Sequence, residues 1–290
     1  MRIFVTGATG FLGSRLVPLL QDHELLCLSR DPQKRSPIRQ GGMLVGDLAQ
    51  PESWRAQIER FAPQWCVHLA WEGLPDYSLS RCRANLDASL NLIEAVVNAG
   101  ATRIVVAGSC WEYGDASGAV QEDAEGQDRG TFAATKHALR TVLHSFAHDR
   151  RIEYRWGRIF FAYGPSQRPG SLIPQCRAAY SAGRQPEIRH PELMHDFVYV
   201  DDVARGMLAI TEADIASGVF NLGSGTPTTV GQVVNRVASY YGVPPPFGST
   251  GSEAGFWADT TKTTAATGWR ATTSLDDGIT QTLQACNGGR

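Results

Sequence analysis

The sequence predicts an α/β protein with a doubly wound parallel sheet and a smaller C-terminal region. Three observations carry this prediction. Short apolar runs alternate with longer helical stretches through the first half, a glycine-rich turn joins the first run to the first helical stretch, and the composition changes after Gly164-Pro165. Strands separated by helices need crossovers, which leave the strands parallel and place helices on both faces of the sheet.

The predicted strands of the first half are short and apolar. They occupy residues 2–6, 24–28, 43–45, 64–70, 103–107 and 153–161. Helical stretches lie between them at residues 13–21, 79–98 and 133–148. The second of these carries Leu86, Leu90 and Ile93 close to the helical period, as expected of a helix that packs on the sheet.

Beyond residue 165 the pattern is less regular, because Pro, Gly and Arg become frequent. It predicts a strand at residues 198–200, a helix at 202–211 and a strand at 220–222. A further helix is expected at residues 228–241, where the first threonines are suited to capping its N-terminus.

Composition excludes several classes of partner. The 290 residues include 27 Lys and Arg against 29 Asp and Glu, a net charge of −2, which removes the electrostatic basis for binding nucleic acid or an anionic membrane. No apolar run approaches the ~18 residues of a membrane span, and the N-terminus lacks the core of a signal peptide, so we expect a cytoplasmic protein. The six cysteines form no CxxC pair, and we expect no metal centre.

The glycine-rich turn follows the first predicted strand and precedes the first helix, with Gly7, Gly10 and Gly13 in a GxxGxxG spacing. Glycine lets the chain turn tightly and lets the backbone approach a pyrophosphate with no Cβ in the way, while the helix N-terminus offers unpaired N–H groups. The turn therefore predicts a dinucleotide site of the Rossmann type. The residues expected to contact the cofactor here are Gly7, Thr9, Gly10, Phe11 and Leu12.

The end of the second predicted strand indicates which dinucleotide is bound. Enzymes that use NAD tend to place an acid there, which binds the ribose 2′-OH. Here Ser29 and Arg30 occupy that place, and an arginine can pair with a 2′-phosphate through two hydrogen bonds. We therefore favour NADP(H), and NAD(H) stays open because Asp31 is close by. Asp47 and Leu48, after the third strand, are expected to meet the adenine base.

Further motifs follow in order along the chain. They are Thr6 to Gly13, His68-Leu69-Ala70, Asn85, Ser109 with Tyr113-Gly114, Arg158 to Pro165, Asp196 to Asp202, Phe220 to Gly225, and Trp257 to Asp259 with Lys262. On these motifs the chain resembles the extended short-chain dehydrogenase/reductase family, the NAD-dependent epimerase/dehydratase group that works on nucleotide-sugars.

The resemblance implies a small-molecule nucleotide-sugar substrate and a homodimer paired through two helices. It implies further cofactor contacts from Leu69, Ala70 and Phe160. It also implies a division of the chain, in which residues 1–165 with about 192–225 form the dinucleotide-binding domain. Residues from about 166 to 191 and from 226 to 290 would then form the substrate-binding region.

The catalytic group of that family is a Ser or Thr with a Tyr-x-x-x-Lys pair. The resemblance assigns Ser109 to hold the substrate oxygen and Lys136 to hold the nicotinamide ribose, but it places Phe132 where the acid/base tyrosine stands. Residues four apart share one helix face, so both would reach one pocket. Phenylalanine has no proton to move, and a positioned acid/base contributes about 10²–10⁴-fold, roughly 3–5 kcal/mol of barrier.

Three explanations of Phe132 stay open. It is an engineered replacement of tyrosine, or this is a natural family member that moves the proton with another acid or a water, or the protein has lost catalysis and kept binding. Tyr77 precedes Arg81 by four residues, but it lies near a different helix and is interpreted as structural. The residues near enough in sequence to be the other acid are Cys110, Glu112, Thr131 and Thr135.

The residues after Ser109 bear on the reaction. Family 4,6-dehydratases carry Asp-Glu at the places of Cys110 and Trp111, so dehydration is disfavoured. Reduction or epimerisation at C4 of an activated deoxysugar remains, with a non-catalytic dinucleotide-binding sensor or scaffold as the alternative. His195 stands where relatives have an arginine for the diphosphate. The predicted substrate contacts are Trp71, Cys110, Trp111, Glu112, Arg189 and His195.

Overall fold

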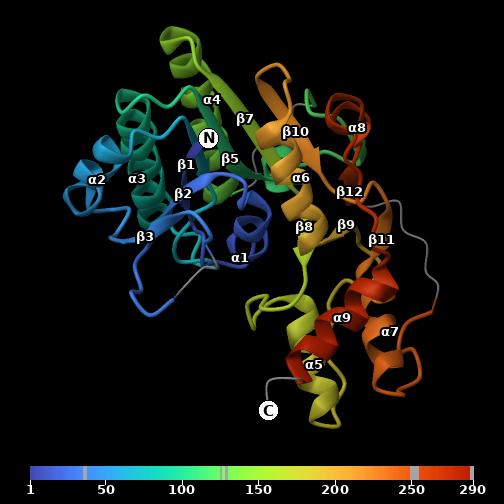
Figure 1. Ribbon diagram of the computed structural model, residues 1–290. Helices are drawn as coiled ribbons and strands as arrows, with labels where there is room; N and C mark the ends of the chain where they lie inside the picture. The colour runs from blue at the N-terminus through green and yellow to red at the C-terminus, as the bar shows by residue number, and fades with distance from the viewer. Residues whose placement is uncertain (35–37, 125, 128–129, 249–254, 288–290) are drawn as a thin grey trace.

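The computed structural model describes residues 1–34, 38–124, 126–127, 130–248 and 255–287 (Figure 1). Its main feature, within these residues, is a seven-stranded parallel sheet in the order β10-β7-β5-β4-β1-β2-β3. The strand order reverses between β1 and β4, the point at which doubly wound sheets bind ligands. This confirms the predicted fold class. The strands are β1 (Arg2–Thr6), β2 (Glu24–Ser29), β3 (Gly41–Val45), β4 (Trp65–His68), β5 (Arg103–Ser109), β7 (Glu153–Ile159) and β10 (Gly218–Leu222).

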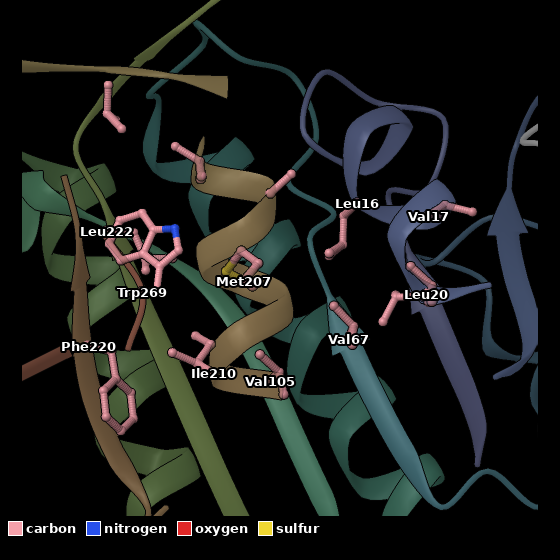
Figure 2. Close-up of a cluster of buried hydrophobic side chains, with 14 of the residues drawn as sticks. Leu16, Val17, Leu20, Val67, Val105, Met207, Ile210, Phe220, Leu222 and Trp269 are labelled. Atoms are coloured by element: carbon pink, nitrogen blue, oxygen red, sulfur yellow. The ribbon is translucent and has the colours of Figure 1, made fainter. Parts of the chain in front are cut away.

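Helices cover both faces of this sheet because successive side chains of each strand point to opposite faces. Ile3 and Val5 of β1 pack with α1 (Gly13–Leu16), its continuation η1 (Val17–Leu20) and α6 (Val200–Glu212). Phe4 packs with α2 (Arg55–Phe61), α3 (Leu79–Asn98) and α4 (Thr131–Arg150). Figure 2 shows the first face, where Met207 and Ile210 of α6 are directed at the sheet.

A second, smaller sheet joins distant parts of the chain. Its order is β11 (Pro227–Thr229), β9 (Met194–Tyr199), β12 (Gly255–Ala258) and β6 (Gly118–Val120), and β8 (Phe161–Tyr163) also pairs with β9. Beside it α5 (Leu172–Ser181), α7 (Val230–Tyr240) and α9 (Leu275–Asn287) gather around their own buried cluster, at the bottom of Figure 1. The remaining elements are η2 (Pro51–Ser53), η3 (Cys110–Tyr113) and α8 (Thr261–Thr267). No helix in the described ranges is long and apolar enough to cross a bilayer.

The bounds of most predicted elements differ by a few residues from those observed, and two of the differences have a clear structural cause. The strand expected at 153–161 is two strands, because Ile159 pairs with Leu222 whereas Phe161 turns away to pair with Phe197 in β9. The helix expected at 228–241 begins at Val230, since the two residues before it belong to β11. The expected threonine cap is confirmed, because the Thr229 side chain accepts from the backbone N–H of Gln232 at 3.0 Å.

The cluster around α5, α7 and α9 has a bearing on the expected division of the chain. It draws on residues 166–191 and 226–290, but also on Tyr163 and Tyr199. Meanwhile α8 lies against β10 of the large sheet. We therefore keep the division at residue 165 as a proposal about function rather than as a boundary of packing.

Candidate active site

The turn after β1 is closed too tightly for any residue but glycine at two places. Gly7 has a φ of 73°, and a Cβ there would lie 2.8 Å from the backbone nitrogen of Ala70. A Cβ on Gly13 would lie 2.0 Å from the carbonyl oxygen of Gly7. The bare backbone that results is what a pyrophosphate needs to approach, so these residues fit a dinucleotide. Of the other predicted contacts, Gly10 is exposed, and Thr9, Phe11 and Leu12 are half-buried.

A buried hydrogen-bond chain fixes the segment after β4. The Nδ1 of His68 lies 2.7 Å from the Thr6 hydroxyl, and its Nε2 lies 2.9 Å from the Ser89 hydroxyl. Burial, helped by the charge of Lys136, lowers the pKa of His68 to about 3, so the ring is neutral. The Asn85 amide accepts from the Glu72 backbone N–H and donates to its carbonyl. Half-buried Leu69 and Ala70 are thereby held beside the glycine turn.

The ends of β2 and β3 carry the residues predicted to bind the adenosine half. Ser29 is buried, and its hydroxyl donates to the Asp31 carbonyl at 3.2 Å. Arg30 is exposed but ion-paired with Glu72, whose carboxylate also lies 3.6 Å from Nη1 of Arg81. The structure therefore gives Arg30 a carboxylate partner that the sequence did not reveal. After β3, half-buried Asp47 accepts the N–H of Ala49 at 2.9 Å, and Leu48 beside it is half-buried too.

The turn after β5 presents Ser109 and Trp111. The Ser109 hydroxyl accepts from the Trp111 N–H at 3.2 Å, and the Glu112 carboxylate accepts from the Ser109 N–H at 2.7 Å, which makes a capping box for η3. Ser109 is half-buried, and Trp111 is 37% exposed. These two side chains are therefore placed where a ligand can reach them.

Glu112 faces the interior, which corrects its expected role as a substrate contact or acid. Its side chain is fully buried and accepts from Nε1 of Trp156 at 3.0 Å and from Nε of Arg158 at 3.2 Å. Burial is the largest influence on the pKa of Arg158 and lowers it, but the Glu112 carboxylate and Tyr113 together more than offset burial, so the pKa is raised. Glu112 therefore holds the Ser109 turn in place.

Cys110 is also an interior residue, against expectation. It is 2% exposed and belongs to the cluster of Figure 2. Burial, together with Asp196 and Glu112, raises the pKa of its thiol well above the usual range, so it offers neither a substrate contact nor an acid. The Thr135 hydroxyl donates to the Thr131 carbonyl at 2.6 Å, which commits its proton to α4.

Phe132 and Lys136 lie one turn apart on α4. The buried Nζ of Lys136 donates to the Ala107 carbonyl of β5 at 2.9 Å and lies 4.0 Å from the centre of the Trp71 ring. Burial lowers the pKa of Lys136 to about 8, although Glu112 opposes the shift. Lys136 is thus a buried cation that is bonded to β5 at Ala107, two residues before Ser109.

Four rings form what we call the aromatic cluster: Trp71, Tyr77, Trp111 and Phe132. The Phe132 ring centre lies 5.3 Å from that of Trp71, 5.4 Å from that of Tyr77 and 5.7 Å from that of Trp111. Tyr77 and Trp111 also touch, at 5.3 Å. The cluster connects the Ser109 turn to Lys136, because Trp111 is bonded to Ser109 and Trp71 covers the ammonium.

Tyr77 is the residue that sequence reasoning set aside and the structure brings to the site. It lies on the loop between β4 and α3, and its hydroxyl accepts from Nη2 of Arg168 at 3.4 Å. The carboxyl ends of β4 and β5 are neighbours, so a loop after β4 lies beside the turn after β5. That adjacency was the signal that could have linked Tyr77 to Phe132.

The remaining predicted residues lie elsewhere. Phe160 is 3% exposed and packs on Tyr113 and Phe256, so its side chain serves the core and leaves only its backbone for a cofactor. His195 of β9 stacks on Phe161 at 4.1 Å, and burial lowers its pKa. Exposed Arg189 lines a polar cavity of about 500 Å³ with residues of α5 and with Arg184.

The sequence of this chain was compared with family models and known proteins. The model of the NAD dependent epimerase/dehydratase family matches residues 3–223. The chain belongs to this family. The resemblance seen in the motifs is thereby confirmed.

Three similar proteins show the range of chemistry in the epimerase/dehydratase family. The chain is 24% identical to dTDP-L-rhamnose 4-epimerase of Burkholderia thailandensis, over 96% of this chain and 93% of that protein. It is 24% identical to dTDP-6-deoxy-L-talose 4-dehydrogenase (NAD(+)) of Aggregatibacter actinomycetemcomitans, over 81% and 89%. The solved structure of MoeE5 with UDP-glucuronic acid and NAD shares 28% identity, covers all of both chains and superposes with a TM-score of 0.85.

Proposed function

We propose that this protein is a nucleotide-sugar oxidoreductase that reduces or epimerises C4 of an activated deoxysugar. The observation that carries the proposal is a buried, cationic Lys136 bonded to the carboxyl end of β5, the strand that ends in Ser109. A buried lysine with a lowered pKa is costly to the fold and is typical of functional sites. The similarity to a 4-epimerase and a 4-dehydrogenase of dTDP-deoxysugars supports C4 as the position.

Each residue has a part in that reaction. The nicotinamide of a bound dinucleotide supplies or accepts the hydride. The Ser109 hydroxyl accepts one N–H and keeps its proton to donate to the C4 oxygen of the sugar. Lys136 would hold the nicotinamide ribose with its remaining N–H groups, and Trp71 and Trp111 would exclude water. We further propose that Arg184 and Arg189 hold the nucleotide diphosphate, because neutral His195 is a weaker phosphate partner.

Restoring a tyrosine at position 132 tests the proposal. Where no other residue of the site supplies the acid, we expect Phe132→Tyr to raise kcat for 4-keto-6-deoxysugar nucleotides at least 100-fold, because a positioned acid contributes about 10²–10⁴-fold. Where another residue already donates the proton, the gain should be small. The measurement is the loss of reduced-coenzyme absorbance. Phe146→Tyr is the control, since it adds a hydroxyl to the same helix beside Arg150 and is expected to leave kcat unchanged.

The second candidate is a non-catalytic dinucleotide-binding sensor or scaffold. The close contacts among the four rings of the aromatic cluster favour it, because Phe132 is packed there without a hydroxyl. Dinucleotide binding without turnover, by both the wild type and Phe132→Tyr and on every keto-sugar nucleotide tried, would establish this candidate instead.

For the coenzyme we propose NADP(H). Arg30 is 58% exposed, and Glu72 keeps Arg81 as a partner if Arg30 turns to a 2′-phosphate. Glu72 competes with that phosphate, so Glu72→Gln is expected to shift the ratio of Kd values about tenfold toward NADPH over NADH, about 1.4 kcal/mol, the size of a hydrogen bond between charged groups. Titration by quenching of tryptophan emission measures both constants.

Arg30→Gln is the matched control for the coenzyme and should move the ratio in the opposite direction. If neither substitution changes the ratio of the NADPH and NADH Kd values, NAD(H) would be assigned to this chain; NAD is the coenzyme named with MoeE5.

We also propose a homodimer. The long helices α3 and α4 pack side by side on one face of the large sheet, and each exposes a large apolar side chain, Leu79 and Val142. Sedimentation of the wild type, compared with that of a Leu79→Asp/Val142→Asp variant, measures the oligomeric state directly.

A further inference from the structure

We propose that Tyr77 is the proton donor of this site, in place of the tyrosine that position 132 lacks. The inference rests on the proposed function, because it names the acid that the reduction needs. Three rings contact Phe132, and of these only Tyr77 carries an acidic hydroxyl. A phenol is the same chemical group that a tyrosine at position 132 would supply, presented from the β4 loop instead of from α4.

The hydroxyl of Tyr77 is available to a ligand. In the described part of the chain its one recorded polar partner is Arg168, which donates to it at 3.4 Å, so the phenol proton itself has no acceptor. Two tyrosines of the core differ in this respect. The Tyr113 hydroxyl donates to Asn221 at 2.6 Å deep in the core, and that of Tyr154 is bonded to His144. Tyr77 is also half-buried, whereas Tyr113 is fully buried.

The surroundings of Tyr77 suit a group that gives up a proton. The Arg168 guanidinium faces the phenol oxygen and would stabilise the negative charge left on it. Arg168 itself is exposed, so water can return the proton to the oxygen. The ring is held between Trp111 and Phe132, which restricts the hydroxyl to few positions without occupying it.

The position relative to Ser109 and Lys136 also fits. Tyr77 packs on Trp111, whose N–H is bonded to the Ser109 hydroxyl, and on Phe132, which packs on the Trp71 ring that covers Lys136. The aromatic cluster therefore links all three groups that the reaction needs, Tyr77 as a member and Ser109 and Lys136 through direct contacts. The chain supplies them from β5, from α4 and from the loop before α3.

The step balances as follows for a keto-sugar. A bound reduced nicotinamide dinucleotide would supply a hydride, one proton with two electrons, to the C4 carbon. The carbonyl π pair would move onto its oxygen, and the Tyr77 O–H proton would move to that oxygen. The products are a C4 hydroxyl, the oxidised dinucleotide and a Tyr77 phenolate. A proton from water then restores the phenol, so nothing else is consumed.

Exchanging the two positions tests the proposal. We expect Tyr77→Phe to lower kcat at least 100-fold, because it removes one hydroxyl and keeps the ring. KM should stay within threefold and the dinucleotide Kd, read by tryptophan quenching, within twofold, since the hydroxyl serves proton transfer and not binding. The double variant Tyr77→Phe/Phe132→Tyr should recover at least 30-fold. Tyr241→Phe, which removes a hydroxyl bonded to Ser181, is the control and should match the wild type.

Arg168→Met separates proton transfer from packing. It should lower kcat about tenfold in the wild type but leave the double variant unaffected, because its charge acts only through Tyr77. A merely structural Tyr77 would change the unfolding temperature and the dinucleotide Kd along with kcat.

Each result decides something. Equal kcat in the wild type and Tyr77→Phe would overturn the role of Tyr77 and leave the proposed function standing. Turnover by Phe132→Tyr from a silent wild type would do the same, because Tyr77 would then have moved no proton. The proposed function itself would be overturned if no turnover is measured for the wild type, for Phe132→Tyr or for the double variant while all three bind the dinucleotide.

Discussion

Replacement of Glu112 with glutamine is expected to lower the free energy of unfolding by about 3–5 kcal/mol, the cost of breaking a buried ion pair from one side. The Glu112 side chain is fully buried, and Arg158 beside it is 4% exposed. Arg140 lies 3.9 Å away on the other side. Glutamine keeps the shape and the acceptor for the Ser109 N–H, but it leaves the Arg158 charge in the interior without a counter-charge.

Urea unfolding of both proteins at pH 7 measures this difference. Asp87→Asn is the matched control, because it removes a carboxylate from an exposed i,i+4 pair with Arg83 and should cost less than about 1 kcal/mol. A loss for Glu112→Gln no larger than the control's would mean that the pair is solvated. The Glu112→Leu/Arg158→Met variant should be more stable than Glu112→Gln, since it removes both charges.

The double substitution has a consequence at the active site. Glu112 closes the capping box that orients Ser109, so the Glu112→Leu/Arg158→Met variant, which removes the acceptor of the Ser109 N–H, should also lower kcat. Arg158→Met would share that effect through its bond to the carboxylate. Glu112 is thus a positioning residue, although the sequence made it a candidate ligand.

The large sheet was predictable because most of its strands are short apolar runs with turn or helix signals on either side. Gly7 and Gly13 mark the first crossover. The need for glycine at position 13 is local, because a Cβ there would meet Gly7 and Ala8, whereas the need at position 7 also comes from the distant Ala70. The region around α5 and α9 was not predictable in the same way. Both helices pack on a buried cluster that distant segments build together, including Tyr163 and Tyr199, and no local sequence pattern indicates such a cluster.

The residues of the site that belong to sequence motifs were predictable, but the burial and contacts of their neighbours were not. In the tight turn after β5, Ser109 and Trp111 retain exposure while Cys110 and Glu112 point inward. Neighbouring residues therefore differ in burial, and in so short a turn their spacing in the sequence does not show which of them point inward. The interpretation of Tyr77 as merely structural failed for a different reason. It is 55 positions from Phe132 in the sequence (132 − 77), although their rings are in contact.

Replacement of Lys136 with methionine should uncouple activity from stability. We expect turnover to fall at least 100-fold, because the cation that holds the ribose is removed. We expect the free energy of unfolding at pH 7 to rise by about 1–2 kcal/mol. A folded-state pKa of about 8 against about 10.4 in the unfolded chain means that folding a charged Lys136 costs about 3 kcal/mol, and the lost bond to Ala107 offsets about 1 kcal/mol of the relief.

The pH dependence gives this prediction a sharper form. Between about pH 8 and pH 10.4 the unfolded wild type binds more protons at residue 136 than the folded protein, so this residue makes the wild type more stable as pH rises through that window. The buried tyrosines and cysteines titrate alike in both proteins, so the difference between wild type and Lys136→Met isolates the lysine. The advantage of the variant should therefore shrink from pH 8 to pH 10 and stay constant from pH 6 to pH 7.

Lys262→Met is the control for the lost ammonium. Lys262 is exposed over the Phe220 ring, and its replacement should change the free energy of unfolding by less than about 0.5 kcal/mol and leave turnover intact. If Lys136→Met proved less stable than the wild type at pH 7, or if its advantage did not depend on pH, the ammonium would have to be solvated in the folded protein. A solvated ammonium would be no cost to the fold, and the strongest physical argument that position 136 is kept for function would disappear.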